Sequence, residues 1–472
     1  MTSTIVMKFG GTSVGNAEAI AQAASLVRQE AENWERVVVV VSAMRGVTDA
    51  LIEGARTAEQ GDPETYRGIV SDLRVRHTLV VAALISDAEV RTSLLRTVDA
   101  YLDEYATFCH SVHVLGEVTP RAMDTISSMG ERVNARVVAA HLREQGVAAE
   151  AVDATDLIVT DDRFQQAVPQ MAETRVQVQK NLVPLLEEGI IPVVTGFMGA
   201  TRTGITTTLG RGGSDYSASV LGAALDADEV WTWTDVDGVL TADPRIVADA
   251  HIIPELSYSE VSELAYFGAK VLHPKTIRPV VESNIPLWVK NTFNPTCPGT
   301  RIIAEPNGTP GMVKAVTAIQ GLSMVTVEGR GMMGVPGIAA RTFSAVASQG
   351  ASVLMISQAS SEQSICFVIP SPDVPAVITA IEEALALELS RRDIERVWAL
   401  DDVVIVSAVG AGLRGTPGVA AKLFSALSAK EINIIAIAQG SSECSISLVV
   451  DSTQATPAVT QIHREVINHV AA

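Results

Sequence analysis

The C-terminal third of the sequence contains an internal repeat, which constrains the fold strongly because both copies must form the same structural unit. The segment "GMMGVPGIAARTFSAV" at 331–346 matches "GLRGTPGVAAKLFSAL" at 412–427, and "ISQASSEQSICFVI" at 356–369 matches "IAQGSSECSISLVV" at 437–450. Both matches are offset by 81 residues (412 minus 331, and 437 minus 356), so they align without a gap. In the second match 8 of 14 positions are identical, where typical composition predicts about one. The sequence therefore predicts a duplicated module.

Each copy of the repeat has the pattern strand, glycine turn, helix, strand, hairpin, strand, helix. The first copy continues into "IERVWALDD" (394–402), which predicts a fourth strand, whereas the second copy ends at Ala472 directly after its helix. A further apolar run at 313–319 precedes the first copy and belongs to neither pattern. We expect this run to cross over as a strand and complete the second sheet, so that the two modules interlock.

The first 303 residues alternate short apolar runs with longer amphipathic segments. This alternation predicts a mainly parallel sheet covered by helices on both faces. The stretch from Gly61 to about Cys109 is helical in pattern, and we expect it to pack beside the sheet. Two prolines and two glycines in "AEPNGTPGM" mark a linker. The predicted division is a domain at 1–303, a linker at 304–312 and a C-terminal region at 313–472, with modules at about 320–400 and 401–472.

The composition excludes several classes of partner. The chain has 472 residues, with 54 acidic and 35 basic side chains and a formal net charge of −19. This charge argues against binding to nucleic acid or to an anionic membrane. The longest purely apolar run, 37–41, has the length of a strand, and the N-terminus has no signal-peptide pattern. Four scattered cysteines predict free thiols. We therefore expect a cytoplasmic protein.

The opening segment "MTSTIVMKFGGTSVG" passes from an apolar strand directly into Lys8 and the pair Gly10 and Gly11, and a helix is predicted from Asn16 onward. Two glycines in a turn from strand to helix allow backbone N–H groups to approach a ligand closely, and the lysine adds a positive charge. This combination predicts an anion site, and phosphate is the expected anion. The alternative is an ordinary turn with an exposed lysine.

The segment "TTTLGRGGSDYSASVLGAAL" at 206–225 is more specific. It combines three threonines, three glycines around Arg211, and Ser214 and Asp215 at the start of a long helix. Hydroxyl groups, backbone donors and a guanidinium with a bidentate fork thus occur in one loop. A purely structural loop does not need an arginine between glycines, so we expect a binding function here.

Three further motifs carry weaker signals, and each has a structural alternative. Glu131 in "SMGERVNARVVAAHL" lies in the first turns of a helix, where a carboxylate also complements the helix dipole. Asp235 in "WTDVDGVLTADPR" follows a strand, where α/β proteins bind nucleotides, but it is also a common turn residue. Lys270 in "YFGAKVLHPKTI" is, taken alone, more typical of a solvated lysine.

Two further motifs suggest ligand sites that the surrounding sequence does not support. Both repeat copies contain G-x-G-x-x-G after a strand, at Gly329 and Gly410, which suggests dinucleotide binding. Each unit closes with a hairpin after about 80 residues, however, so the further βαβ units of a dinucleotide crevice are missing. The "DVDG" beginning at Asp235 suggests a calcium loop, but it lacks the third acidic ligand and the glutamate at loop position 12. We expect neither NAD nor a protein-held metal.

Taken together, the motifs resemble those of the aspartate kinases, members of the amino-acid kinase family. "VMKFGGTSV", "VVSAMRGVT", "GERVNAR", "VTGFMG", "TTTLGRGGSDYSA", "TDVDGVLTADPR" and "FGAKVLHPKT" occur in that family's order, followed by two ACT-type regulatory modules. The resemblance covers the whole chain. It implies an α/β fold, with a three-layer α/β/α amino-acid kinase domain, a mainly parallel sheet and two interlocked α+β ACT modules of βαββαβ type.

The resemblance also implies roles for individual residues. Lys8 and Asp215 would be catalytic, Glu131 would meet the α-ammonium group of aspartate, and Arg211 its α-carboxylate. Leu240 departs from the family, in which many members carry a tyrosine beside the nucleotide, so we expect looser nucleotide contacts. The implied aspartate site comprises Ser42, Thr48, Glu131, Phe197, Arg211 and Ser214. The implied ATP site comprises Lys8, Gly10, Gly11, Thr12, Thr234, Asp235, Leu240, Arg245 and Lys270.

The chemistry of the implied reaction fits the residues present. A β-carboxylate is ionised at pH 7, so its attack on the γ-phosphate of ATP needs no general base, and catalysis reduces to alignment and charge neutralisation. We expect Mg²⁺ to be held mainly by phosphate and water.

Regulation is expected in the repeated modules, where Gln358 and Gln439 occupy equivalent positions ahead of Ser-Ser-Glu. An amide there can bind both the carboxylate and the hydroxyl group of a small amino acid, although it can also cap a hairpin. "MISQASSEQSICF" is similar to the threonine-responsive aspartate kinases, so threonine is the first choice of effector and lysine, alone or in concert, the second. We expect a homodimer or larger assembly. The implied effector residues are Met355, Gln358, Ser361, Gln439 and Ser442.

Other readings remain open at this point. A kinase of the same fold that acts on glutamate, acetylglutamate or a nucleotide is one alternative. A non-catalytic amino-acid sensor is another, although Lys8, Arg211 and Asp215 are all present. Because the sequence ends at Ala472, we do not expect a fused homoserine dehydrogenase.

Overall fold

The computed structural model describes residues 3–268, 272–306, 311–332, 335–358, 363–439 and 444–467. The chain forms two compact units. The first unit comprises Met1–Val239, Pro254–Tyr258 and Val271–Pro306, and the second comprises Leu240–Ile253, Ser259–Lys270 and Asn307–Ala472. Within the described residues no helix combines the length and the hydrophobicity that crossing a membrane requires.

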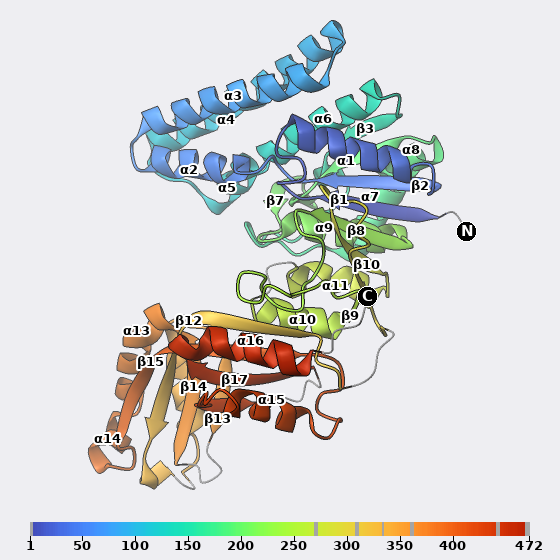
Figure 1. Cartoon of the computed structure of the whole chain (residues 1–472). Coiled ribbons are helices and arrows are strands. Elements are labelled where there is room, and N and C mark those ends of the chain that lie inside the picture. Colours follow the sequence, from blue (N-terminus) through green and yellow to red (C-terminus); the bar gives the residue numbers. More distant parts are fainter. Residues whose placement is uncertain are drawn as a thin grey trace. The chain divides into compact units, whose positions relative to one another are not determined.

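An eight-stranded sheet forms the centre of the first unit, in the order β3-β5-β2-β1-β8-β10-β11-β9 (Figure 1). Neighbouring strands are parallel except for β10 and β11. The chain builds outward from β1 on one side first and later continues on the other side with β8, so the strand order reverses between β1 and β8. The bounds are β1 Thr4–Phe9, β2 Arg36–Val41, β3 Ala149–Val152, β5 Ile191–Thr195, β8 Glu229–Thr234, β9 Glu255–Ser257, β10 Leu287–Asn291 and β11 Thr300–Ile303.

Helices cover both faces of this sheet, as the alternating pattern predicts. Ile5 and Met7 of β1 point into a core shared with α1 and α6, while Val6 faces α9, where Gly222 allows close packing against Val230. A small second sheet contains β4 Val159–Thr160, β6 Met198–Thr201 and β7 Thr206–Thr208. The helices are α1 Ala17–Glu30, α2 Val47–Glu59, α3 Pro63–Leu84, α4 Ala88–Leu115, α5 Pro120–Ser127, α6 Met129–Glu144, α7 Met171–Asn181, α8 Val183–Glu187, α9 Gly213–Leu225 and α11 Pro274–Glu282.

The predicted helical excursion is the hairpin of α3 and α4, drawn in blue in Figure 1. It packs on α2 through Tyr105, whose hydroxyl group donates to the carbonyl of Leu51 at 3.2 Å. A Cβ atom at Gly54 would lie 2.0 Å from the same hydroxyl oxygen. Glycine is therefore required where α2 meets α4.

The second unit contains a six-stranded sheet in the order β13-β14-β12-β15-β17-β16. Its strands are β12 Ala315–Glu328, β13 Met355–Gln358, β14 Ser364–Pro370, β15 Arg396–Val409, β16 Ala436–Ala438 and β17 Ser445–Asp451. Its helices are α10 Tyr258–Tyr266, α12 Ile338–Ser348, α13 Val374–Ala384, α14 Ala386–Arg391, α15 Val419–Ser428 and α16 Ala455–Val466.

The two repeat copies interlock through β12 and β15. Residues 315–319 of β12 pair with 405–409 of β15, next to β17, whereas 322–328 pair with β14 of the first copy. The sequence predicts two successive strands in the region of β12 and two in the region of β15, but the structure has one continuous strand in each region. The exposed Gln320 and Gly321 interrupt the apolar pattern, and the ladder continues across them through register shifts.

Two segments from the predicted N-terminal domain belong to the compact second unit. Ala242 and Val247 lie in a buried cluster with side chains of β12, β15 and α16, and Phe267 lies in another with side chains of β13 and β15. Glu260 of α10 pairs with Lys314, with Nζ and Oε2 2.9 Å apart. The second unit therefore draws part of its core from residues 240–253 and 259–268.

Candidate active site

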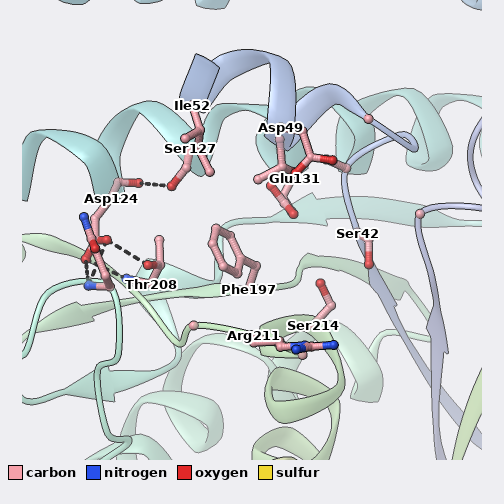
Figure 2. Close-up of a pocket in the computed structure, with 18 of the residues that line it drawn as sticks. Ser42, Asp49, Ile52, Asp124, Ser127, Glu131, Phe197, Thr208, Arg211 and Ser214 are labelled. Atoms are coloured by element: carbon pink, nitrogen blue, oxygen red, sulfur yellow. Dashed lines mark hydrogen bonds between the residues drawn. The ribbon is translucent and has the colours of Figure 1, made fainter. Parts of the chain in front are cut away.

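A pocket of about 500 Å³ lies where β1, β2 and β5 end (Figure 2). Ligand sites in open α/β sheets are found outside the carboxyl ends of parallel strands. The pocket is lined by many residues that the sequence nominated, from motifs more than 100 positions apart. These residues are Lys8, Gly11, Ser42, Thr48, Glu131, Phe197, Arg211, Ser214 and Asp215.

The loops after β1 and β2 are tied together by backbone hydrogen bonds. Ser42 donates its N–H to the carbonyl of Phe9 at 3.1 Å, and Arg45 donates its N–H to the carbonyl of Gly11 at 3.0 Å. A Cβ atom at Gly11 would lie 3.1 Å from the carbonyl oxygen of Ala43. Glycine at this position thus allows the two loops to form one wall of the pocket.

Lys8 and Asp215 form an ion pair in this pocket, with Nζ and Oδ1 2.7 Å apart. The lysine projects from β1, and its side chain is only 9% exposed. Asp215 lies in the first turn of α9, where the helix dipole favours a negative charge. The pair therefore holds an ammonium group in place at the carboxyl end of the central strand.

Glu131 supplies a second, very different carboxylate. It lies in the first turn of α6 and is buried, and its Oε2 atom has no hydrogen-bond partner among the described residues. Burial raises the pKa of Glu131 to about 8, although a backbone hydrogen bond from Ala43 opposes the rise. A carboxylate oxygen without a partner, in a pocket, can bind a cationic group.

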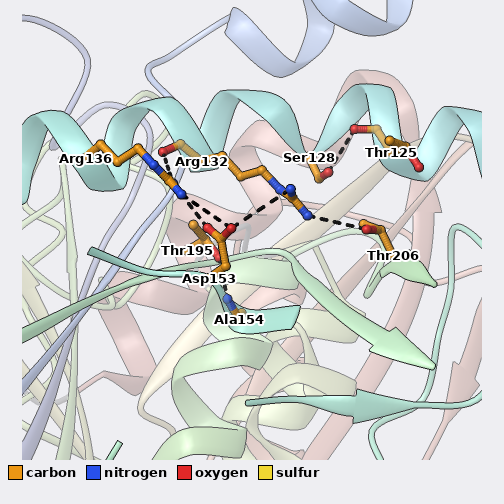
Figure 3. Close-up of polar contacts among 8 residues, drawn as sticks. All are labelled: Thr125, Ser128, Arg132, Arg136, Asp153, Ala154, Thr195 and Thr206. Carbon is orange, nitrogen blue, oxygen red and sulfur yellow. Dashed lines mark hydrogen bonds and ion pairs between the residues drawn. The ribbon is translucent and has the colours of Figure 1, made fainter. Parts of the chain in front are cut away.

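The position of α6 is fixed by an arginine cluster (Figure 3). Arg136 contacts Asp153 with Nη1 and Oδ1 3.2 Å apart, and Arg132 approaches the other oxygen of the same carboxylate at 4.0 Å. Arg132 also donates to the hydroxyl group of Thr206 in β7 at 3.4 Å. These contacts anchor the helix whose first turn carries Glu131.

Phe197 and Ser214 are brought to the pocket by close packing at two glycines. A Cβ atom at Gly196 would lie 2.6 Å from the hydroxyl oxygen of Ser214, and one at Gly213 would lie 2.7 Å from the ring of Phe197. Phe197 itself has a φ of 72°, a left-handed conformation that is unfavourable outside glycine. Such strain is concentrated at functional sites.

Arg211 completes the pocket from the loop before α9, between Gly210 and Gly212, which both have positive φ. Its side chain is exposed, and it forms no ion pair with any residue that the structure describes. Figure 2 shows Arg211 and Glu131 approaching from opposite sides of the pocket. Glu131 and Arg211 thus offer an anionic group and a cationic group on opposite walls of the pocket.

Sequence reasoning missed several lining residues. Asp124 and Ser127 of α5 share a wall with Glu131 of α6, and the spacing of three residues could have placed Asp124 and Ser127 on one helical face. Gln165 and Thr208 carry no comparable signal. The remaining lining residues that the sequence did not nominate include Ala43, Met44, Arg45, Gly46, Asp49, Ile52, Arg56 and Met123.

Other nominated residues lie elsewhere. Gly10 and Thr12 do not line this pocket, and the N–H of Gly10 donates to the carbonyl of Trp233 at 3.1 Å. Thr234 ends β8 and Asp235 follows it, and the hydroxyl group of Thr234 donates to Oδ1 of Asp235 at 3.2 Å. Leu240 and Arg245 belong to the second unit, where Arg245 pairs with Asp243 at 2.6 Å. Lys270 lies outside the described residues.

The nominated effector residues lie in the second unit. Gln358 ends β13 and Gln439 follows β16, and both side chains are exposed at equivalent points of the repeat. Met355 is buried in the core between β13 and its neighbours, which favours a packing role. Ser361 and Ser442 lie outside the described residues.

Comparison with known proteins gives consistent matches over the whole chain. Residues 3–291 match the amino acid kinase family, and residues 325–385 and 406–466 each match the ACT domain. The bifunctional aspartokinase/homoserine dehydrogenase 1, chloroplastic, of Arabidopsis thaliana is 38% identical over 467 residues, which cover 98% of this chain and 51% of that protein. The chain spans about half the length of such bifunctional relatives.

Solved structures match over nearly the full length. E. coli aspartokinase III in complex with aspartate and ADP (R-state) is 30% identical with a TM-score of 0.79, covering 98% of this chain and 99% of that one. The same enzyme in complex with lysine and aspartate (T-state) is 29% identical with a TM-score of 0.80, covering 98% and 100%.

Proposed function

The chain belongs to the amino acid kinase family, and we propose that it phosphorylates the side-chain carboxylate of L-aspartate with ATP to form 4-phospho-L-aspartate. The observation that carries this proposal is the charge pattern of the pocket. Among the described residues, Oε2 of Glu131 has no hydrogen-bond partner and the guanidinium of Arg211 forms no ion pair, while the Lys8 ammonium group is held by Asp215. The related E. coli enzyme binds aspartate and ADP, which supports the same substrate pair.

Aspartate complements this pattern group by group. Its α-ammonium group is assigned to Glu131 and its α-carboxylate to Arg211, whose fork suits bidentate binding. Its β-carboxylate then extends toward Lys8. Ser42, Thr48, Phe197 and Ser214 are assigned to the walls that orient the molecule. A nucleotide acceptor lacks the ammonium group that would compensate the buried Glu131.

The reaction needs little from the protein beyond alignment and charge. An oxygen of the ionised β-carboxylate forms a bond to the γ-phosphorus of ATP, the bond from that phosphorus to the bridging oxygen breaks, and ADP leaves. No proton is removed, so no general base is required. Lys8 neutralises charge that develops on the transferring group. Mg²⁺, when bound with ATP, neutralises further phosphate charge.

For the nucleotide, we assign Lys8, Gly10, Gly11, Thr12, Thr234 and Asp235 from the first unit. Their support is the reversal of strand order between β1 and β8, since nucleotides bind at such switch points. Leu240, Arg245 and Lys270 keep the assignment that the family resemblance implies.

We assign residues 313–472 to regulation by an amino acid, in a homodimer or larger assembly. Threonine is the first candidate effector because of the glutamines at Gln358 and Gln439, and lysine is the second. The lysine complex of the E. coli relative supports the second candidate. Met355, Ser361 and Ser442 remain assigned only by resemblance.

The test is an ATP-dependent assay in which hydroxylamine traps the acyl phosphate as a hydroxamate. Aspartate, glutamate, N-acetylglutamate and a nucleoside monophosphate are offered separately, and ADP release is followed in parallel. We expect hydroxamate with aspartate and at most a trace with the others. A product from another acceptor and none from aspartate would reassign the substrate. No product from any acceptor, despite amino-acid binding by calorimetry, would identify a sensor instead.

A further inference from the structure

We propose that Asp124 is a positioning residue that holds the loop carrying Arg211 and thereby sets recognition of the substrate's α-carboxylate. This inference rests on the proposed function, because it assigns a role within the aspartate pocket. Asp124 lies in α5, on the same wall as Glu131, but it has the opposite character: its carboxylate is fully partnered by the protein.

The carboxylate of Asp124 accepts hydrogen bonds from two segments far away in the sequence (Figure 2). Thr208 donates its hydroxyl group to Oδ1 at 2.7 Å and its N–H to Oδ2 at 2.9 Å. Gln165 donates its N–H between the two oxygens, at 3.0 Å from each. Asp124 has no exposed surface, so these donors replace water completely. One side chain thus joins α5, the end of β7 and the loop before α7.

Both segments that Asp124 joins are in contact with the loop that carries Arg211. Thr208 is the last residue of β7, and only Leu209 and Gly210 separate it from the arginine. Gly210 packs against Gln165, because a Cβ atom at Gly210 would lie 2.9 Å from the carbonyl oxygen of Gln165. Asp124 therefore fixes the start of the arginine loop and also the surface on which its glycine rests.

The local backbone supports a role in positioning. Gln165 has a φ of 69° and Gly210 a φ of 79°, both in the left-handed region. A non-glycine residue remains in that region only when the surrounding contacts determine it, and here the hydrogen bond to Asp124 is such a contact. No cation among the described residues forms an ion pair with Asp124, and burial raises its pKa despite the three donors. Burying a carboxylate costs free energy of solvation, so packing alone does not account for an aspartate at this position.

The test compares ligands that differ by one charged group. Succinate lacks the ammonium group of aspartate, and 3-aminopropanoate lacks its α-carboxylate. For Asp124→Asn, whose amide would direct its own N–H groups at donors, we expect the KM for aspartate and the inhibition constant of succinate to rise about tenfold or more, with kcat changed less. The inhibition constant of 3-aminopropanoate should change by less than about threefold.

Two further variants keep the test decisive. Thr208→Val removes only the hydroxyl donor. It should weaken the binding of aspartate and succinate relative to 3-aminopropanoate by a smaller factor than Asp124→Asn does. It therefore serves as the test where Asp124→Asn fails to fold. Asp72→Asn makes the same charge change at an exposed position of α3 and should leave all three constants unchanged. Equal weakening of the three ligands, or no weakening of aspartate and succinate, would overturn the proposal. If the wild type fails to phosphorylate aspartate, the proposed function fails instead.

Discussion

Lys8 and Asp215 are joined by a 2.7 Å contact between Nζ and Oδ1, although Lys8 lies in β1 near the N-terminus and Asp215 lies in the first turn of α9. The contact fixes the ammonium group where a phosphoryl group is proposed to transfer. It also compensates a nearly buried charge, since an unpaired lysine there would lose solvation without an ionic partner.

We therefore expect Lys8→Ala to lose most turnover while aspartate still binds. Removal of one preorganised electrostatic contact costs on the order of 10²–10³ in rate. Steady-state kinetics in the hydroxamate assay give kcat and KM separately. Lys180→Ala, at an exposed position of α7, is the matched control and should retain full activity. A change confined to the KM for aspartate would show that Lys8 is misassigned.

Arg211→Lys should weaken the binding of aspartate more than it lowers kcat. A lysine retains the charge but cannot reproduce the bidentate fork, so we expect aspartate to bind about tenfold or more weakly, with a smaller effect on ATP. Isothermal titration with aspartate measures the change directly. An unchanged affinity would remove Arg211 from the substrate site.

The KM for aspartate should fall as pH rises from 6 toward 8. The raised pKa of Glu131, about 8, leaves the carboxyl largely protonated at pH 6, and only its ionised form attracts the ammonium group. The apparent affinity follows the ionised fraction, about tenfold per pH unit below the pKa. Glu131→Gln should bind weakly at every pH and lose this dependence. A flat pH profile in the wild type would contradict the assignment.

The carboxyl group of Glu131 also makes the stability of the folded protein depend on pH, and this stability falls over the pH range in which the affinity for aspartate rises. Because folding raises its pKa above the unfolded value of 4.5, its contribution to the unliganded protein is fully present below that value and is lost as pH rises through about 8. Thermal unfolding without ligand should therefore show Glu131→Gln gaining stability relative to the wild type as pH rises from about 5 to about 8, with no further gain above that pH. Saturating aspartate should remove that advantage, since it compensates the ionised carboxylate.

Threonine and lysine, titrated separately and together against activity, should reveal the effector. A bound effector stabilises a less active state through its differential affinity for the two states, a coupling of about 1–3 kcal/mol. We expect Gln358→Ala and Gln439→Ala to raise the inhibitory concentration without changing basal activity. Full sensitivity in both variants, or no inhibition of the wild type by either amino acid, would remove these glutamines from the effector site.

Much of the pocket was predictable because glycine, lysine and arginine at strand ends have few structural reasons to occur together. The position of Asp124 was not predictable in this way. Its hydrogen-bond partners are 41 and 84 residues away, at Gln165 and Thr208, and nothing in a single sequence reports such distances. A carboxylate on an amphipathic helix has the same local pattern whether it is solvated or buried.

The interlocked sheet shows a similar limit. The repeat predicted two modules and a crossing strand, and in the structure 315–319 pair with 405–409. The continuity of β12 was missed because Gln320 and Gly321 end the apolar period locally. Whether a ladder resumes after such a break depends on its partner strand, which is chosen by tertiary packing and not by local propensity.

The core of the second unit is built from two separate parts of the chain, and this matters for the design of chimeric enzymes. Ala242, Val247 and Phe267 pack among strands that begin only after residue 311. A graft that exchanged regulatory modules between relatives at the linker would leave these three side chains facing a foreign core, with mismatched volumes. Residues 240–253 and 259–268 should therefore travel with the transplanted modules, whereas 254–258, which carry β9, should stay with the sheet of the first unit.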